Sequence, residues 1–400
     1  EYGGELSLRA GSYNLYKPTV DVYGPISDKL AFRLIGTYEK SDSYRDVVKS
    51  ERLYINPSLL YKLSENTEIT LQGDYLKSDF TPDFGIGTVG NALSPLARNT
   101  FINVPWAYNK TNTVTAQLMI NHTINDSWKI NASASLQSYN RNYFSAERPF
   151  ADAAGVAARN LTRSKNEEFT YNQQINLNGN FNTGSLRHTV LVGADADQSN
   201  TNAFGFAYTA PNGGNYGNFN LLDPTTYVTR TDVPETYIMT DTYTPIYRMG
   251  AFVQDMVAIT DQFKVLAGLR WTFQKTPRTT VETVSDQTTK PGTTATKIDQ
   301  AFSPKLGFIF QPMPTTSLYV SYANNFTSNS GRDIYDAPMG ASIIDHYEAG
   351  IKNDFLDGKL SANVTWYKIV NDKFAQMALF DAAGSPNSDA NIKEFSGESA

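Results

Sequence analysis

One stretch of this chain, residues 53–77 (LYINPSLLYKLSENTEITLQGDYLK), constrains its possible folds more than any other. Apolar or aromatic side chains recur at every second position, and polar side chains occupy most of the positions between them. The four polar residues 64–67 interrupt this alternation, which then resumes. Since successive side chains of a β-strand point to opposite faces, the stretch predicts a hairpin with one apolar and one polar face. Each strand has about ten residues or slightly more, enough to cross a bilayer at a tilt.

The same hairpin pattern recurs along the whole chain and predicts about fifteen strands. Short turns, such as 64–67, 125–127 and 182–185, alternate with long polar or glycine-rich loops, such as 80–110, 142–166 and 198–245. Long structureless loops argue against a compact soluble domain, whereas outer-membrane barrels combine short turns on one rim with long loops on the other. The sequence therefore predicts an all-β fold, a transmembrane antiparallel β-barrel whose short turns and long loops lie at opposite rims.

Aromatic residues on the apolar face fall into two sets. One set lies beside the short turns: Tyr61, Trp128, Phe181, Phe263, Phe310 and Phe355. The other lies further along the same face: Tyr38, Tyr75, Trp271 and Trp366. At ~3.3 Å per residue and a tilt near ~45°, the two sets are about 15–20 Å apart, as expected for two interfacial girdles. The alternative, a large soluble β-sandwich or solenoid, would scatter its exposed aromatic residues.

Composition agrees with the barrel and excludes several other classes of protein. The chain of 400 residues has 24 Tyr and 22 Phe, and no stretch of 18 apolar residues that would predict a transmembrane helix. A mean hydropathy of −0.40 is compatible with a barrel, because half of each strand faces water. The absence of cysteine excludes disulfides and thiolate chemistry. A net charge of −6 without a basic cluster disfavours nucleic acid as a partner.

Several stretches resemble TonB-dependent outer-membrane receptors, especially ferrichrome-type siderophore receptors. They are residues 9–21 (RAGSYNLYKPTVD), 30–45 (LAFRLIGTYEKSDSYR), 250–270 (GAFVQDMVAITDQFKVLAGLR), 302–312 (FSPKLGFIFQP), 318–322 (LYVSY) and 347–360 (YEAGIKNDFLDGKL). Each stretch is weak evidence by itself, but their order along the chain is specific.

This resemblance implies a 22-stranded barrel filled by an N-terminal plug, in the outer membrane of a Gram-negative bacterium. The chain begins at Glu1 without a plug or TonB box and stops after residues 394–400 without a closing strand, so we expect residues 1–400 to be a partial barrel domain. The implied function is active uptake of a ferric siderophore, with a hydroxamate of the ferrichrome type as the expected ligand. The TonB complex would act through the missing N-terminal region.

The predicted inner face carries charges of both signs. They are Arg33, Glu39, Lys62, Glu68, Asp74, Lys129, Asp195, Arg270, Lys305, Glu348 and Lys352. We interpret this face as a hydrated wall that holds a polar plug. A charge-selective pore is the alternative, but the charges form no ring of a single sign.

We expect no cofactor and no metal site of the protein's own, because a siderophore brings the ligands of its iron. No His-x-His or carboxylate–His spacing suggests a protein-bound metal. Ligand contact is predicted for aromatic residues of the loops: Phe80, Phe84, Trp106, Tyr108, Tyr143 and Phe144. Packing within the loops is the alternative role for each of them.

Other functions remain open at this point. A barrel enzyme would require a histidine with Ser or Asp at a shared depth, but His122 and His188 are expected at the interface and His346 at the loop end of a strand. We therefore expect no enzyme. A receptor for an oligosaccharide, cobalamin or haem, or a passive porin, stays possible.

Overall fold

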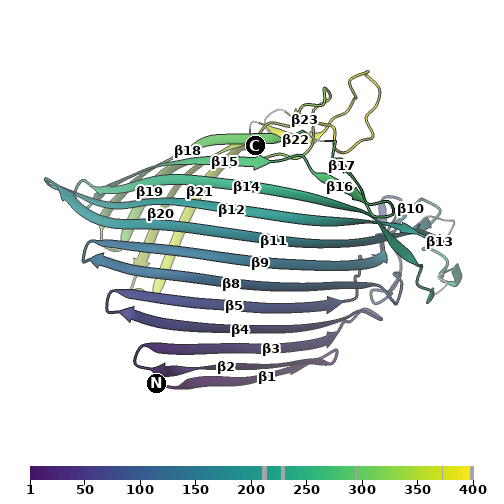
Figure 1. Cartoon of the computed structure of the whole chain (residues 1–400), viewed down its shortest axis with the longest axis horizontal. Coiled ribbons are helices and arrows are strands. Elements are labelled where there is room, and N and C mark those ends of the chain that lie inside the picture. Colours follow the sequence, from purple (N-terminus) through teal and green to yellow (C-terminus); the bar gives the residue numbers. More distant parts are fainter. Residues whose placement is uncertain (210–213, 227–229, 294, 372, 397–400) are drawn as a thin grey trace.

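The chain folds into one large antiparallel sheet. The computed structural model describes residues 1–209, 214–226, 230–293, 295–371 and 373–396. Within that part, fifteen long strands form a continuous ladder (Figure 1): β1 (Gly3–Gly11), β2 (Leu15–Ser27), β3 (Leu30–Asp42), β4 (Lys49–Ser64), β5 (Thr67–Phe80), β8 (Tyr108–Asn125), β9 (Trp128–Ala146), β11 (Val156–Thr183), β12 (Leu186–Tyr208), β14 (Thr236–Ala258), β15 (Phe263–Thr276), β18 (Lys297–Met313), β19 (Thr316–Thr327), β20 (Ser342–Phe355) and β21 (Leu360–Asn371). This agrees with the predicted number.

Shorter elements lie in the connections between these strands and in the segment that follows β21. They are β6 (Thr88–Val89), β7 (Ala92–Leu93), β10 (Phe150–Ala151), β13 (Asn215–Asn220), the 3₁₀ turn η1 (Pro224–Thr226), β16 (Thr280–Thr283), β17 (Thr288–Pro291), β22 (Phe374–Met377) and β23 (Lys393–Ser396). In the described ranges, no helix has the length and apolar character needed to span a membrane.

The ladder is open, as predicted. Each long strand pairs antiparallel with the long strands before and after it in the chain, from β1–β2 through to β20–β21. No register joins β1 to β21 within the described residues, and Figure 1 shows a curved sheet with β19, β20 and β21 behind the strands in front. The sheet therefore has the curvature of a barrel without its closure.

The two rims carry different connections. In Figure 1 the turns after β4, β8 and β11 lie on one side, and the long connections after β5 and β12 lie on the other. This confirms the predicted topology of these elements. One short link departs from the general pattern, because the three residues 12–14 between β1 and β2 share the rim of the long loops.

The two faces of the ladder have opposite character. Leu59 pairs with Leu71, which also pairs with Leu118, and these three side chains are 39%, 50% and 40% exposed. On the other face the amide of Asn131 donates to Asn121 at 2.6 Å and accepts from Asn178 at 2.7 Å. An exposed apolar face opposite a hydrogen-bonded polar face is the arrangement of a barrel wall between lipid and a wet lumen.

Several strands are longer than the sequence pattern predicted. Parts of the expected loops 142–166 and 198–245 belong instead to β9, β11, β12 and β14. These strands continue, paired with their neighbours, beyond the apolar band. The predicted boundaries were wrong because the alternation of apolar and polar residues fades where a strand leaves the membrane and no longer faces lipid. Residues 210–213 and 227–229 of the second loop, and the expected chain end 397–400, lie outside the described residues.

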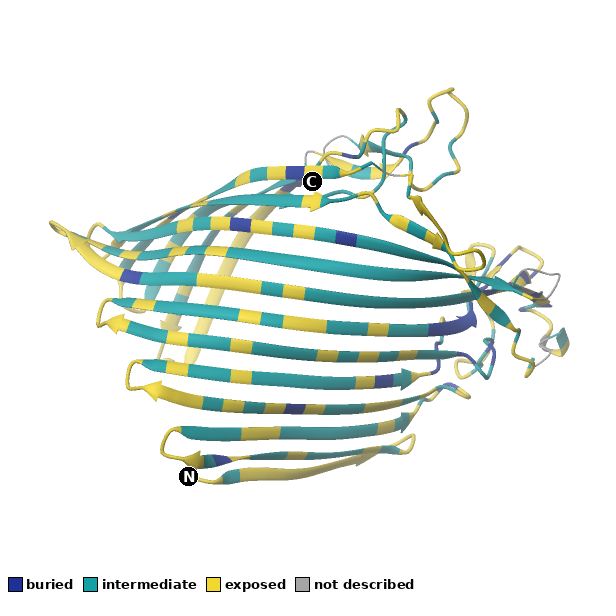
Figure 2. Ribbon diagram, viewed as in Figure 1, coloured by how far each residue is buried: buried dark blue, intermediate teal, exposed yellow. Residues whose placement is uncertain are grey.

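Buried side chains gather at the rim of the long loops, where β9 ends (Figure 2). One cluster contains Val104, Ala107, Phe144, Ala146, Leu161 and Tyr216. A second contains Ile102, Ala151, Ala157, Phe219 and Leu221. The loops therefore form packed structure of their own above the membrane.

Candidate functional site

The six aromatic residues predicted to contact ligand lie at one sector of the loop-bearing rim. Phe80 is the last residue of β5 and Tyr108 the first of β8, while Phe84 and Trp106 belong to the link 81–107. Tyr143 and Phe144 lie near the end of β9. Four of the six are thus strand residues, and the structure brings most of them close together.

Trp106, Tyr108 and Phe144 form a packed aromatic cluster. The Trp106 ring meets that of Phe144 edge-on, with centroids 4.8 Å apart, and that of Tyr216 at 5.9 Å. The Tyr108 ring meets Phe144 at 6.5 Å. Because Phe144 is only 3% exposed, its ring packs within the loops in this conformation.

Arg163 of β11 lies against this cluster. Its guanidinium is 4.2 Å from the centroid of Phe206 and 5.6 Å from that of Phe144. It donates hydrogen bonds to the side chain of Asn142 at 2.6 Å and to the carbonyl of Tyr143 at 3.0 Å. Stacking on aromatic faces stabilises the cation and ties β11 and β12 to the end of β9.

A different set of side chains occupies the opposite, concave face of the same strand ends. The register pairs Phe80 with Asn109 and Asn109 with Tyr143, and residue 141 shares their face by strand alternation. Arg141 donates to the side-chain oxygen of Asn109 at 3.1 Å, and its guanidinium lies 4.7 Å from the centroid of Tyr143. No carboxylate of the described residues forms an ion pair with Arg141, which leaves a cation facing the lumen at its mouth.

Arg141 was not predicted from the sequence. The pattern Tyr139-Asn140-Arg141-Asn142-Tyr143 alternates two tyrosines with an arginine on one face, which was a usable signal. It was missed because Arg141 directly precedes residues 142–166, which were assigned to a loop, so its neighbour Tyr143 was not recognised as lying on the same strand face.

A single amide fixes the link 81–107 to β9. The side-chain nitrogen of Asn103 donates to Ser145 Oγ at 2.7 Å and to the Pro82 carbonyl at 2.9 Å. Its oxygen accepts from the backbone N–H of Val104 at 2.7 Å and of Ala146 at 3.1 Å. Ser145 is fully buried, so these bonds are shielded from water.

A buried ion pair joins the same link to the connection between β3 and β4. Arg45, which is 8% exposed, pairs with Asp83 and donates to the Arg98 carbonyl at 2.8 Å. Beside it, Asn99 donates to the carboxylate of Asp46 at 3.1 Å. The loops of this sector therefore hold one another in place.

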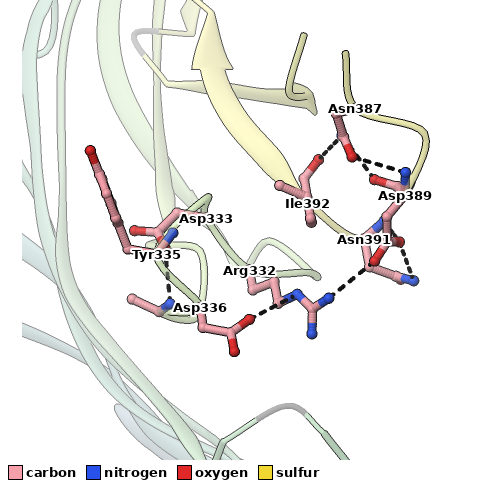
Figure 3. Close-up of polar contacts among 9 residues, drawn as sticks. Arg332, Asp333, Tyr335, Asp336, Asn387, Asp389, Asn391 and Ile392 are labelled. Atoms are coloured by element: carbon pink, nitrogen blue, oxygen red, sulfur yellow. Dashed lines mark hydrogen bonds and ion pairs between the residues drawn. The ribbon is translucent and has the colours of Figure 1, made fainter. Parts of the chain in front are cut away.

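A second group of loops lies after β19 and β21. Figure 3 shows Arg332 between two carboxylates, with its Nε 3.1 Å from Asp336 and its Nη2 3.1 Å from Asp389. Hydrogen bonds from the backbone N–H and the side-chain amide of Asn391, together with the nearby Arg332 guanidinium, hold the pKa of Asp389 below its usual range. Arg332 thus connects the loop 328–341 to the segment 373–396.

Ion pairs also line the concave wall below the rim. Arg270 binds Asp195 through two contacts of 2.7 and 2.8 Å, and Arg248 binds Asp197 at 2.7 Å. Positive and negative side chains thus neutralise one another within the wall, which favours the hydrated-wall interpretation over a charge-selective pore.

Two of the three histidines, His122 and His188, take structural positions at the short-turn rim. His188 Nδ1 lies 2.7 Å from a carboxylate oxygen of Asp255, and its ring stacks on Phe181 at 4.7 Å. His122 Nδ1 lies 2.8 Å from Thr67 Oγ1. Among the described residues, no group of three or more His, Asp or Glu side chains could hold a metal ion.

Comparison with known proteins gives a single family. A family model described as TonB dependent receptor-like, beta-barrel matches residues 55–393. The metal-pseudopaline receptor CntO of Pseudomonas aeruginosa is 23% identical over 368 residues, covering 91% of this chain and 51% of the relative. The ferric-pyoverdine M114 receptor PbuA of a Pseudomonas species is 24% identical over 393 residues, covering 93% and 46%. The chain therefore spans about half the length of the curated relatives it matches.

Solved structures share the fold. The siderophore receptor PiuA of Acinetobacter baumannii superimposes with a TM-score of 0.83 at 18% identity, over 99% of this chain and 59% of that one. The closed form of the ferric-catecholate import receptor Fiu of Escherichia coli gives 0.81 at 19% identity, over 100% and 61%. Three of these proteins are named for pseudopaline, pyoverdine or catecholates, and PiuA is named for siderophores in general, so they lend no support to the ferrichrome type.

Four observations lead to one assignment. The convex face is apolar, the concave face is wet and ion-paired, the elaborate loops lie at a single rim, and the family model matches residues 55–393. This chain belongs to the TonB-dependent receptor β-barrel family of the Gram-negative outer membrane.

Proposed function

We propose that the complete protein takes up a ferric siderophore by energy-coupled transport, and that the mouth around Arg141 contacts the ligand. The observation that carries this proposal is the unpaired Arg141 guanidinium, held by Asn109 and stacked on Tyr143 on the concave face. A hydrogen bond and an aromatic surface hold this cation in one position. It can therefore bind an anion without the entropy cost of ordering its own side chain. The names of the relatives, which are receptors for metal and ferric siderophores, support the class of cargo.

The aromatic residues divide into two proposed roles. Phe80 and Phe84 are 36% and 39% exposed and are placed to touch a ligand directly. Trp106, Tyr108 and Phe144 would act by holding the loop in shape, because their rings pack on one another. Tyr143, which is 7% exposed, would serve mainly as the surface under Arg141.

The charge at the mouth bears on the kind of siderophore. A ferric tris-catecholate carries net negative charge, whereas the iron centre of a ferric tris-hydroxamate is neutral. An unpaired arginine attracts the former more strongly, especially where the site is partly shielded from water. We therefore favour an anionic ferric complex over the ferrichrome-like hydroxamate that the sequence resemblance implied. The iron is cargo and is held by the siderophore.

Transport would follow the scheme of the family. The ligand binds at the mouth, a plug in the lumen relays its presence, and the TonB complex uses the proton-motive force to open a path. An oligosaccharide, cobalamin or haem receptor and a passive porin are the alternatives. A coding sequence without a plug region upstream of residue 1 would favour the porin.

Binding to the full-length receptor tests the proposal. Quenching of intrinsic fluorescence would be titrated with a ferric catecholate and a ferric hydroxamate, for wild type, Arg141→Gln and Arg187→Gln. We expect Arg141→Gln to weaken catecholate binding by about ten- to a hundredfold, in line with the loss of one hydrogen-bonded charge. Arg187→Gln, which removes an exposed arginine paired with Asp261 at the short-turn rim, is the matched control. Wild-type protein that binds neither complex would contradict the proposed cargo, and equal losses in both variants would contradict the role of Arg141.

A further inference from the structure

A single row of the concave wall links Arg141 to three further cations. Consecutive strands place seven residues opposite one another, from β9 to β1: Arg141, Thr111, Ser78, Arg52, Glu39, Lys17 and Arg9. The link between Glu39 and Lys17 is an ion pair of 2.9 Å, and the other links are pairs of the strand register. Because residues directly opposite each other in an antiparallel sheet share a face, the whole row faces the lumen with Arg141. We call these seven residues the basic row.

The basic row holds four cations and one carboxylate. Glu39 contacts Lys17 at 2.9 Å and Arg52 more loosely at 3.8 Å. The side chains of Lys17 and Arg52 are 36% and 55% exposed, so both remain accessible from the lumen. Among the residues that the structure describes, no carboxylate forms an ion pair with Arg9. Three positive charges are therefore in excess, in contrast to the sector of β12, β14 and β15, where each arginine has its own carboxylate.

The row descends from the mouth into the lumen. Arg141 lies 13 residues from Trp128, where β9 leaves its short turn, and Arg52 lies 12 residues from Ser64, where β4 enters one. Lys17 lies only 10 residues from Ser27, at the corresponding end of β2. Since the short turns lie along one rim, the row becomes deeper by about three residues, or ~10 Å measured along the strands. Arg141 is thus its outer end, and Lys17 and Arg9 form its inner end.

The wall changes character directly inside the row. The next concave positions inward are uncharged: Ser7, Thr19, Thr37, Tyr54, Leu76, Thr113 and Tyr139. Two residues further along the same strands the charged side chains are acidic: Glu5, Asp21 and Asp74, of which Asp21 is paired with Arg33. An anion is therefore attracted to the basic row but not to the wall immediately inside it.

We propose that the basic row is a second binding stage for an anionic ferric complex, which passes from Arg141 to Arg52, Lys17 and Arg9 as it leaves the mouth. This inference rests on the function proposed above and adds three residues that determine specificity for charge. At ~4.8 Å between strands, Arg141 and Arg52 are about 14 Å apart and Arg52 and Lys17 about 10 Å apart. These steps are close to the ~8 Å Debye length, so one cation attracts the complex before it has left the previous cation. The exposed contacts with Glu39 contribute little energy and can be exchanged for contacts with the ligand.

Iron uptake by the full-length receptor tests this stage. Cells that have this receptor as their single route for the complex would be supplied with a radiolabelled ferric tris-catecholate, and the maximal rate and the half-saturating concentration would be measured. The test variant is the triple Arg9→Gln, Lys17→Gln, Arg52→Gln. The matched control is the triple Lys40→Gln, Lys49→Gln, Lys110→Gln, which removes the same charge from the convex face by strand alternation. Heat-modifiable electrophoretic mobility establishes that equal amounts of folded barrel are compared.

The test triple is expected to lower the maximal rate at least about tenfold, because the complex loses the stage that follows the mouth. Its half-saturating concentration should change less than about threefold, since Arg141 still captures the ligand and the removed charges act on the mouth only through screened water. The control triple should match wild type in both quantities. Arg141→Gln should instead raise the half-saturating concentration.

Three results would overturn the proposal. A test triple with the wild-type maximal rate, or a control triple that is equally slow, would remove the basic row from the path of the ligand. A test triple that also admits a large antibiotic into the cells would show that the row holds the plug rather than the ligand. Wild-type cells that take up no ferric catecholate would contradict the proposed function itself, which distinguishes that failure from a failure of the second stage.

Discussion

The side-chain nitrogen of Asn103 lies 2.7 Å from Ser145 Oγ, although the two residues are 42 positions apart in the chain. Asn103 comes from a long connection, and Ser145 from the end of a barrel strand. Their contact, together with the backbone groups of Val104 and Ala146 that bond to the same amide, makes the loop an extension of the barrel wall. A binding surface built on such a loop is largely formed before the ligand arrives.

The first prediction concerns this amide. Asn103→Ala leaves the buried N–H groups of Val104 and Ala146 without their acceptor, which should lower the free energy of local opening by about 2–4 kcal/mol. Hydrogen exchange at these two amides should accelerate about a hundredfold, with β8 strand amides unchanged. Asn99→Ala, which removes an exposed contact with Asp46, is the control and should change exchange little. Unchanged protection in Asn103→Ala would show that the loop does not depend on this amide.

The second prediction concerns the aromatic cluster. Replacing both Trp106 and Tyr108 by alanine removes the rings that pack on Phe144 and should weaken ferric-siderophore binding by about 2–4 kcal/mol, or tens- to several-hundred-fold. Barrel assembly should persist, because the membrane-spanning parts of the strands are untouched. Fluorescence titration of the membrane-inserted double variant measures the effect. Wild-type affinity would remove these two rings from the site and direct attention to Tyr143 and Phe144.

The third prediction separates the two faces of one strand. Leu118→Lys places a charge on the lipid side of β8 and should reduce the free energy of unfolding by about 2–4 kcal/mol. Gln117→Lys, its neighbour on the opposite face, places the same charge in the lumen and should cost less than about 1 kcal/mol. Denaturant titration in lipid vesicles gives both values. A larger loss for Gln117→Lys would reverse the assigned orientation of the wall.

The fourth prediction concerns pH and the contact between Arg332 and Asp389. The pKa of Asp389 is lowered in the folded protein, so its contribution is fully present above the ordinary aspartate pKa near 3.8 and is lost as pH falls through the lower folded value. The distance between spin labels at Tyr335 and Ser388 should therefore stay constant from pH 7 to about 4 and broaden only in stronger acid. Asp389→Asn should show the broad distribution at every pH. A transition between pH 5 and 7 would require another titrating group.

Much of the fold was predictable because the membrane imposes a simple rule. In the stretch 53–77, lipid requires apolar residues on one face and the lumen accepts polar ones on the other, so a period of two was visible in the sequence. Beyond the bilayer this requirement ends. The outer part of β11 therefore carries residues such as Arg159 and Asn160, which gave no strand signal and were assigned to a loop.

The candidate site was less predictable, because it depends on contacts between residues distant in sequence. Aromatic residues in the loops were recognised, but which of them pack together follows from the register of β8 with β9, which pairs Tyr108 with Phe144. The same holds at the opposite rim, where His188 was expected at the interface but its partner Asp255, 67 residues away, was not. Direct ligand contact by the six aromatic residues remains a prediction.

The pairing of every long strand with its neighbours in the chain also bears on how the sheet is made. Each hairpin closes over a turn or a single loop, so no pairing has to wait for a remote part of the chain, and the entropy lost in each closure grows only slowly with loop length. The strands can then be added to the sheet in the same order in which they follow one another in the chain, from β1 to β21. A strand delivered to the growing edge finds its template in the strand just added, and the unpaired edge is never more than one strand from its next partner.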